Sequence, residues 1–142
     1  MSGPSFEFVD HTADLAARLS APTAAGLFEA GAAAFTEALT DRTRVRASGT
    51  RDIELAAYDL DLLLVDWLHE LLFLFETGHL LVADCRVDLT GAPRPALRAT
   101  IQGEPRDPSR HPLKRLIKAV TYHGLHIHQD ADGYHATVIF DI

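Results

Sequence analysis

The segment from Leu60 to Phe75 has the strongest periodic pattern in the sequence, and this pattern limits the fold most tightly. Its large apolar residues recur every three or four positions: Leu60, Leu63, Leu64, Trp67, Leu68, Leu71, Leu72 and Phe75. This spacing places them on one face of an α-helix. Because burying each such side chain stabilises a fold by roughly 1.5–3 kcal/mol, we expect this face to anchor the core. We expect Asp59 or Asp61 to cap the helix start and Gly78 to end it.

Similar patterns predict one more helix and a set of strands. A helix should begin after residues 20–23, with proline in its first turn, and run to about Leu39. Alternating apolar and polar residues predict strands at 6–9, 14–20, 51–58, 81–89, 96–102, 119–129 and 134–141. Turns at 91–93 and 130–133 predict hairpins, hence mainly antiparallel pairing. We therefore expect an α+β fold, a single domain over residues 1–142 with two helices packed on antiparallel β-sheets.

Composition excludes several classes of protein. A hydrophobic content of 47% is too high for a disordered chain. No apolar run reaches the roughly 18 residues of a membrane span, and no secretory signal pattern is present. The single cysteine, Cys85, excludes a disulfide framework, fits a cytoplasmic location, and is expected to be a small core residue. A formal net charge of −7 argues against strong direct binding to nucleic acid and favours a basic protein partner or a metal ion.

The two ends of the chain carry the residues best suited to bind a metal ion. Asp10 and Asp14 lie near the start, and Asp141 lies beside the terminal carboxylate of Ile142. If the fold brings these ends together, their oxygen atoms would form a site for a hard cation such as Ca²⁺ or Mg²⁺. From the residues alone, ordinary solvated acids at strand ends are the commoner alternative.

The polar, proline-rich segment 104–112 is a second candidate site. Proline restricts helix and ladder formation, so we expect a constrained surface loop, and such loops often carry function. Glu104 and His111 within it, and Lys118 beyond it, would form a recognition patch beside the metal. Lys118 opens an apolar strand and is expected to be partly desolvated. The alternative is a solvated loop with scattered charges.

Histidines near the end of the chain suggest a further, weaker site. His126 and His128 would share a strand face, with His135 opposite His128 across a hairpin, forming a possible zinc face. No fourth ligand is evident, however, and exposed strand histidines are common.

The sequence also lacks a phosphate loop, a nucleophile elbow and a dinucleotide fingerprint. An autonomous enzyme is therefore not supported, and a stand-alone metal-dependent phosphoesterase acting on nucleotide or RNA ends is the alternative function.

Four motifs, in order and spread over nearly the whole chain, resemble the archease family. The first three are Phe8-Val9-Asp10-His11-Thr12-Ala13-Asp14, the helical segment 63–72, and a split motif with Gly103-Glu104, Asp107, Arg110-His111 and residues 117–123. The fourth is Phe140-Asp141-Ile142. The chain departs from the family pattern at Ala16, where glycine is expected, and at His69, where asparagine is common. Neither position is a proposed ligand.

This resemblance implies a non-enzymatic protein cofactor of the GTP- and manganese-dependent RNA-splicing ligase that seals split tRNA exons. Archeases speed formation of the ligase–guanylate intermediate and allow multiple turnover. The resemblance also implies a bound divalent cation, calcium in crystals with Mn²⁺ or Mg²⁺ also suited.

The resemblance further implies which residues form the site. The cation would be held by Asp14, Asp141 and the Ile142 carboxylate, with Asp10 as a further candidate. Glu104, His111 and Lys118 would form the polar patch around it.

A general chaperone is a third alternative function. It is weaker because a chaperone needs a large exposed apolar surface, and the expected surface strands lack an apolar stripe.

Overall fold

Both helices begin at capped residues and bury the apolar faces that the sequence predicts. Helix α1 (Ala24–Leu39) follows Thr23, whose side chain accepts a backbone N–H from the first turn. Helix α2 (Leu60–Gly78) follows Asp59, whose carboxylate accepts a first-turn N–H at 2.8 Å. The negative charge of this cap is favourable at the positive end of the helix dipole. Helix α2 ends at Gly78, and its C-cap His79 takes the left-handed conformation (φ 58°) and leads the chain into the next strand.

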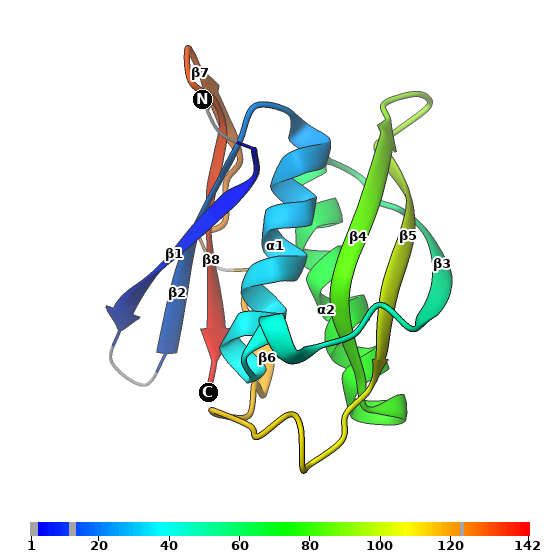
Figure 1. The fold of residues 1–142 in the computed structure, drawn as a ribbon. Coiled ribbons are helices and arrows are strands. Elements are labelled where there is room, and N and C mark those ends of the chain that lie inside the picture. The colour runs from blue at the N-terminus through cyan, green and yellow to red at the C-terminus, as the bar shows by residue number, and fades with distance from the viewer. Residues whose placement is uncertain (1–2, 12–13, 123) are drawn as a thin grey trace.

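The computed structural model describes residues 3–11, 14–122 and 124–142, and these form eight strands in two antiparallel sheets (Figure 1). The strands are β1 (Ser5–His11), β2 (Asp14–Ala21), β3 (Gly49–Ala56), β4 (Leu80–Thr90), β5 (Ala96–Pro105), β6 (Ala119–Val120), β7 (His128–Asp130) and β8 (Gly133–Asp141). One sheet has the order β1-β2-β8-β6, with β7 also paired to β8, and the other has the order β3-β5-β4. A short 3₁₀ helix, η1 (Arg42–Arg44), leads from α1 towards β3.

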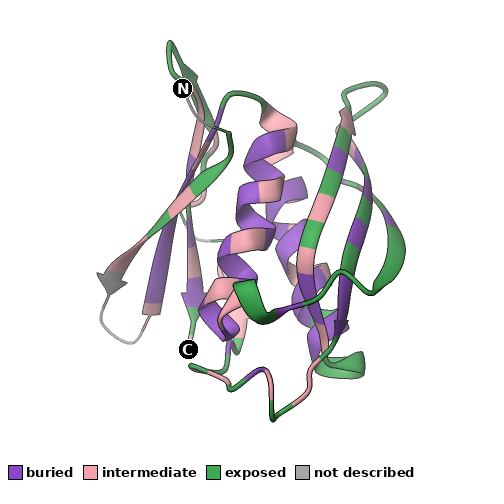
Figure 2. Ribbon diagram, in the orientation of Figure 1, coloured by how far each residue is buried: buried purple, intermediate pink, exposed green. Residues whose placement is uncertain are grey.

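Helix α1 lies between the two sheets, and α2 packs behind it (Figure 1). The buried residues of both helices face this interior (Figure 2). Trp67 is fully buried, and its indole N–H donates to the carbonyl oxygen of Phe28 on α1 at 2.8 Å. The periodic face of α2 is therefore the core anchor that the sequence predicts, and the single-domain α+β fold is confirmed. Neither helix in the described part of the chain is long and apolar enough to span a membrane.

The last strand lies inside its sheet. Strand β8 pairs with β2 along its whole length, from Asp14 opposite Asp141 to Ala21 opposite Tyr134. On its other side β8 pairs with β6 and β7. This position brings the start of β2 and the end of β8 to the same place.

The prediction of one continuous strand over residues 119–129 is wrong for the middle of that segment. Only its two ends are strands, β6 and β7, and between them the described chain leaves the sheet. The carboxylate of Asp61 on α2 accepts the backbone N–H of Ile127 at 2.9 Å, and Gly124 takes a positive φ of 73°. These contacts divert the chain towards α2, although its alternating residues resemble a strand pattern.

The prediction that a surface loop begins at residue 104 is also wrong at its start. Strand β5 continues to Pro105, so Glu104 is a buried residue near the end of a strand and not part of an exposed loop. Gly103 makes this path possible, because a Cβ atom there would lie 1.9 Å from the carbonyl oxygen of Leu81.

Candidate functional site

Asp14 and Asp141, from opposite ends of the chain, lie directly opposite each other on neighbouring strands. They are Cα partners in the register between β2 and β8. Residues paired in this way project from the same face of a sheet, with Cβ atoms about 4.5–5.5 Å apart. Asp141 is exposed and Asp14 is partly buried. The fold thus brings together two carboxylates that the sequence analysis selected as metal ligands.

The segment containing Lys118 closes the other side of Asp141. The backbone N–H of Lys118 donates to the carbonyl oxygen of Asp141 at 2.7 Å, and Ala119 is the strand partner of Asp141. The Lys118 side chain is exposed. Ile142 is partly buried and packs against the core. The end of β8 is therefore held between β2 and β6 and has a defined position.

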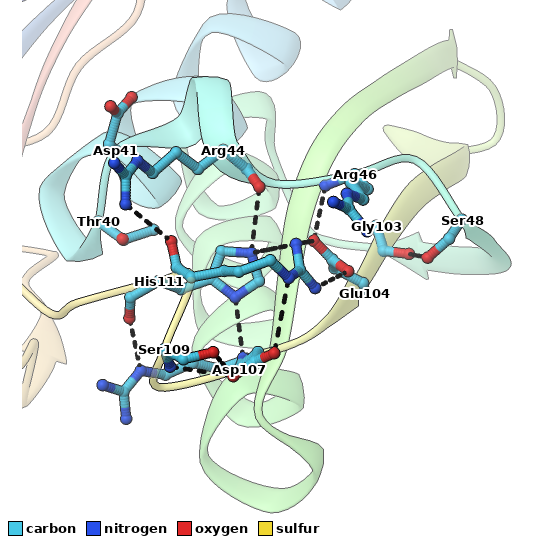
Figure 3. Close-up of polar contacts among 12 residues, drawn as sticks. Thr40, Asp41, Arg44, Arg46, Ser48, Gly103, Glu104, Asp107, Ser109 and His111 are labelled. Carbon is cyan, nitrogen blue, oxygen red and sulfur yellow. Dashed lines mark hydrogen bonds and ion pairs between the residues drawn. The ribbon is translucent and has the colours of Figure 1, made fainter.

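Glu104 and His111 form a second, buried group of polar residues (Figure 3). Glu104 Oε2 lies 2.9 Å from His111 Nε2 and accepts the backbone N–H of Arg46 at 2.8 Å. Arg110 donates to both oxygens of Glu104, at 2.7 and 3.0 Å. Glu104 is only 7% exposed and His111 is fully buried. Because a buried carboxylate without partners is costly, these contacts are what allow a charge at this position.

The hydrogen bonds of His111 indicate which ring nitrogen carries its proton. The backbone N–H of Asp107 donates to Nδ1 at 2.8 Å, so Nδ1 offers a lone pair and the proton is assigned to Nε2. Nε2 then donates to Glu104, with the carbonyl oxygen of Arg44 3.2 Å away. The His111 imidazole therefore joins the backbone of Asp107, the backbone of Arg44 and the side chain of Glu104.

The same contacts shift the acid–base behaviour of the group. Hydrogen bonds from Arg110 hold the pKa of Glu104 at about 2, well below its ordinary value, although burial acts in the opposite direction. Glu104 in turn raises the pKa of Arg110. Hydrogen bonds from Ser109 lower the pKa of Asp107. At neutral pH the Glu104–Arg110 pair is therefore fully ionised.

The chain beyond His111 is fastened to the C-terminal end of α1. The backbone N–H of Lys114 donates to the carbonyl oxygen of Leu39 at 2.8 Å, and the Arg115 guanidinium donates to the carbonyl oxygen of Ala38 at 2.6 Å. These carbonyls have no partners within the helix, and cations are favourable at this end of its dipole. Residues 106–118 are thus held in place at both ends.

The predicted site residues fall into two groups. Asp14, Asp141, Ile142 and the backbone of Lys118 meet at one end of the first sheet. Glu104 and His111 contact each other inside the buried polar cluster, and the described contacts do not link Lys118 to them. The side chain of Asp10 lies outside the described residues. Sequence reasoning missed Arg110 as the partner of Glu104, although the need of a buried carboxylate for a cation would have pointed to a nearby arginine.

The histidines do not form the zinc face that the sequence suggested. The rings of His128 and His135 stack across the β7–β8 pair with centroids 5.3 Å apart. His126 lies outside β7, and its Nδ1 is 3.2 Å from a carboxylate oxygen of Asp61 on α2. In the part of the chain that the structure describes, no three His, Cys, Asp or Glu side chains are grouped so as to hold a metal ion.

Comparisons with known proteins give matches over nearly the whole chain. The model of the Archease protein family matches residues 6–142. The protein archease of Methanosarcina barkeri is 38% identical over 142 residues, which cover 99% of this chain and 97% of the relative. That of Methanopyrus kandleri is 35% identical over 138 residues, with coverage of 96% and 99%. The solution structure of Methanobacterium thermoautotrophicum protein 1598 superposes with a TM-score of 0.86 at 33% identity, covering 96% of this chain and 98% of that one.

Proposed function

The chain belongs to the archease family, and we propose on this premise that it is a non-enzymatic protein cofactor of an RNA-splicing ligase. In this proposal it binds a divalent cation, promotes the GTP- and Mn²⁺-dependent guanylylation of the ligase, and allows multiple turnover in tRNA splicing. A cytoplasmic location fits this role, because the single Cys85 needs no oxidising compartment.

The observation that carries the metal-binding part is the register that pairs Asp14 with Asp141. Carboxylates directly opposite each other repel, and a shared cation would convert this repulsion into attraction. The carboxylate of Ile142, or the Asp10 side chain, would supply the remaining oxygen donors. An all-oxygen donor set suits Ca²⁺, Mg²⁺ or Mn²⁺ and does not select among them. The residues at this end of the sheet therefore fit a hard divalent cation.

Each group of residues would have a separate task in this mechanism. Asp14 and Asp141 would present oxygen donors to a partner at the end of β2 and β8, where Asp141 is exposed. The β6 segment and the backbone of Lys118 fix the position of Asp141. The buried Glu104 and His111 act indirectly, by holding the chain that leads to Lys118. A bound cation would supply positive charge next to phosphate oxygens in the ligase active site.

The proposal is tested by following covalent guanylylation of the cognate ligase with labelled GTP and Mn²⁺, with and without this protein. We expect faster formation of the ligase–guanylate adduct and repeated rounds of RNA joining. A time course that this protein leaves unchanged would contradict the proposal. A parallel incubation without ligase, with Mn²⁺ and generic phosphoesters, covers the alternative: turnover there would indicate a stand-alone phosphoesterase.

A further inference from the structure

The positive charges of this acidic chain are concentrated in two segments. Residues 41–52 and 104–118 hold nine of the 13 Lys and Arg residues but only four of the 20 Asp and Glu residues. The two segments therefore carry a formal charge of +5, whereas the rest of the chain carries −12. The overall charge of −7 hides this separation.

The two segments meet in space and form one surface, which we call the basic loop surface (residues 41–52 and 104–118). The carbonyl oxygen of Arg44 contacts His111, and the backbone N–H of Arg46 donates to Glu104 (Figure 3). Residues 106–118 cross the end of the molecule at which the C-terminus lies, whereas residues 41–52 run from the end of α1 across the lower part of the molecule into β3 (Figure 1). The 106–118 part of the basic loop surface therefore lies at the same end of the protein as the Asp14–Asp141 pair, to which the backbone of Lys118 is bonded.

Several cations in these segments are engaged within the protein. Arg110 binds Glu104, Lys114 binds Glu37, and Arg115 binds the end of α1. By contrast, Arg46 and Arg51 are exposed, and no hydrogen bond or ion pair to either side chain occurs among the described residues. These two guanidinium groups are available to an anionic ligand.

The backbone that carries Arg46 is held rigidly. Its N–H is bound by the buried carboxylate of Glu104, and the preceding carbonyl of Arg44 is bound by His111. Arg51 lies in β3, where it pairs with Ile101 of β5. A surface fixed in this way loses little conformational entropy when it binds a ligand.

We propose that the basic loop surface contacts the phosphate backbone of RNA held by the ligase. Arg46 and Arg51 are five positions apart in the sequence, up to about 17 Å in extended chain, so they can reach more than one phosphate of a polymer. Arginine suits phosphate oxygens because its fork of N–H donors matches their geometry. The net negative charge of the protein opposes RNA binding by the protein alone, so the contact depends on the ligase holding the RNA.

This inference rests on the proposed function, which brings the same end of the protein towards the site where RNA ends are joined. An acidic surface of the ligase itself is the competing ligand for these arginines. The experiment must therefore separate contact with RNA from contact with ligase protein.

The test compares R46E/R51E with R86E/R94E, a control that makes the same change in net charge at exposed arginines on β4 and the turn after it. Each variant and the unmodified protein are added to ligase and an RNA substrate that carries 4-thiouridine near the joining site. We expect ultraviolet light to cross-link the RNA to the unmodified protein and to the control. The yield should fall at least severalfold in R46E/R51E.

Two further measurements make the outcome unambiguous. In RNA joining by pre-guanylylated ligase, R46E/R51E should raise the KM for RNA. The slope of log KM against log salt concentration should also become smaller by about 1.4, roughly 0.7 for each lost phosphate contact. In the absence of RNA, both variants should stimulate guanylylation of the ligase equally. This measurement therefore tests the proposed function separately from the RNA contact. Equal cross-linking and equal KM in the two variants would overturn the inference. So would a selective loss of affinity of R46E/R51E for RNA-free ligase, which would identify a ligase contact.

Discussion

The guanidinium group of Arg110 binds both carboxylate oxygens of Glu104, and His111 and the backbone of Arg46 bind the same carboxylate. One side chain at the end of β5 therefore gathers contacts from two segments that are distant in the sequence. Its removal should affect the whole group, because each partner would lose its acceptor.

Replacing Glu104 by alanine should lower the free energy of unfolding by about 3 kcal/mol, since it removes the carboxylate that accepts from His111 and the Arg46 N–H. It also leaves the partly buried Arg110 with only its 3.5 Å ion pair to Asp107 among the described residues. Urea denaturation measures this loss. Glu54→Ala is the matched control, because Glu54 pairs with Arg98 on the exposed face of the second sheet and should cost less than about 1 kcal/mol. Equal losses in the two variants would show that the buried cluster does not stabilise the fold.

Acid should destabilise the protein through Glu104. In the unfolded chain this carboxyl has its ordinary pKa of 4.5, whereas hydrogen bonds from Arg110 hold its pKa at about 2 in the folded protein. As pH falls from about 4.5 to about 2, the unfolded state takes up a proton that the folded state does not, so the free energy of unfolding falls. Its contribution is complete above this window. Urea titrations at several pH values should show a shallower acid dependence for Glu104→Gln, and parallel curves would argue against this origin.

Replacing Asp14 or Asp141 by asparagine should remove stimulation of ligase guanylylation and weaken the binding of Ca²⁺ or Mn²⁺, measured by calorimetry. Asparagine keeps the shape of the side chain but removes the charge that a hard cation requires. Asp88→Asn, on the exposed face of β4, is the control and should change neither property. The metal-binding proposal fails if Asp141→Asn binds the cation as tightly as the unmodified protein.

Gly103→Ala should destabilise the protein by about 1–3 kcal/mol, because the added methyl group would lie 1.9 Å from the Leu81 carbonyl oxygen and would force β4 and β5 apart. Thermal unfolding followed by circular dichroism measures the effect. The same change at Gly91 meets no atom within 4 Å and serves as the control. Similar melting temperatures for the two variants would mean that β4 shifts without cost.

The sequence predicted the helices well, because their apolar period and caps are local. Leu60 to Phe75 can bury one face only as a helix, and Asp59 lies where its cap is required. The prediction of a continuous strand over residues 119–129 was wrong in the middle of the segment, because the alternating residues fit a strand when only the local pattern is considered. Its path is set instead by Asp61, a residue on α2 that no local pattern links to it.

The candidate site was predictable to a similar extent. The sequence selected Asp14 and Asp141 as candidate ligands on the condition that the two ends of the chain meet, and the register places Asp14 opposite Asp141. The environment of Glu104 was not predictable, since its burial depends on β5 continuing past residue 102. Its contact with the backbone of Arg46 joins segments that show no common pattern in sequence.

The interior position of β8 has a consequence for biosynthesis. Every other strand precedes β8 in the chain, yet β2, β6 and β7 all find their partner in it. A nascent chain on the ribosome can assemble the β3-β5-β4 sheet early, but β1 and β2 must remain an open hairpin until β8 emerges. A frameshift or stop codon within β8 would therefore remove both Asp141 and the strand that joins the first sheet, and we expect such truncated chains to be unstable.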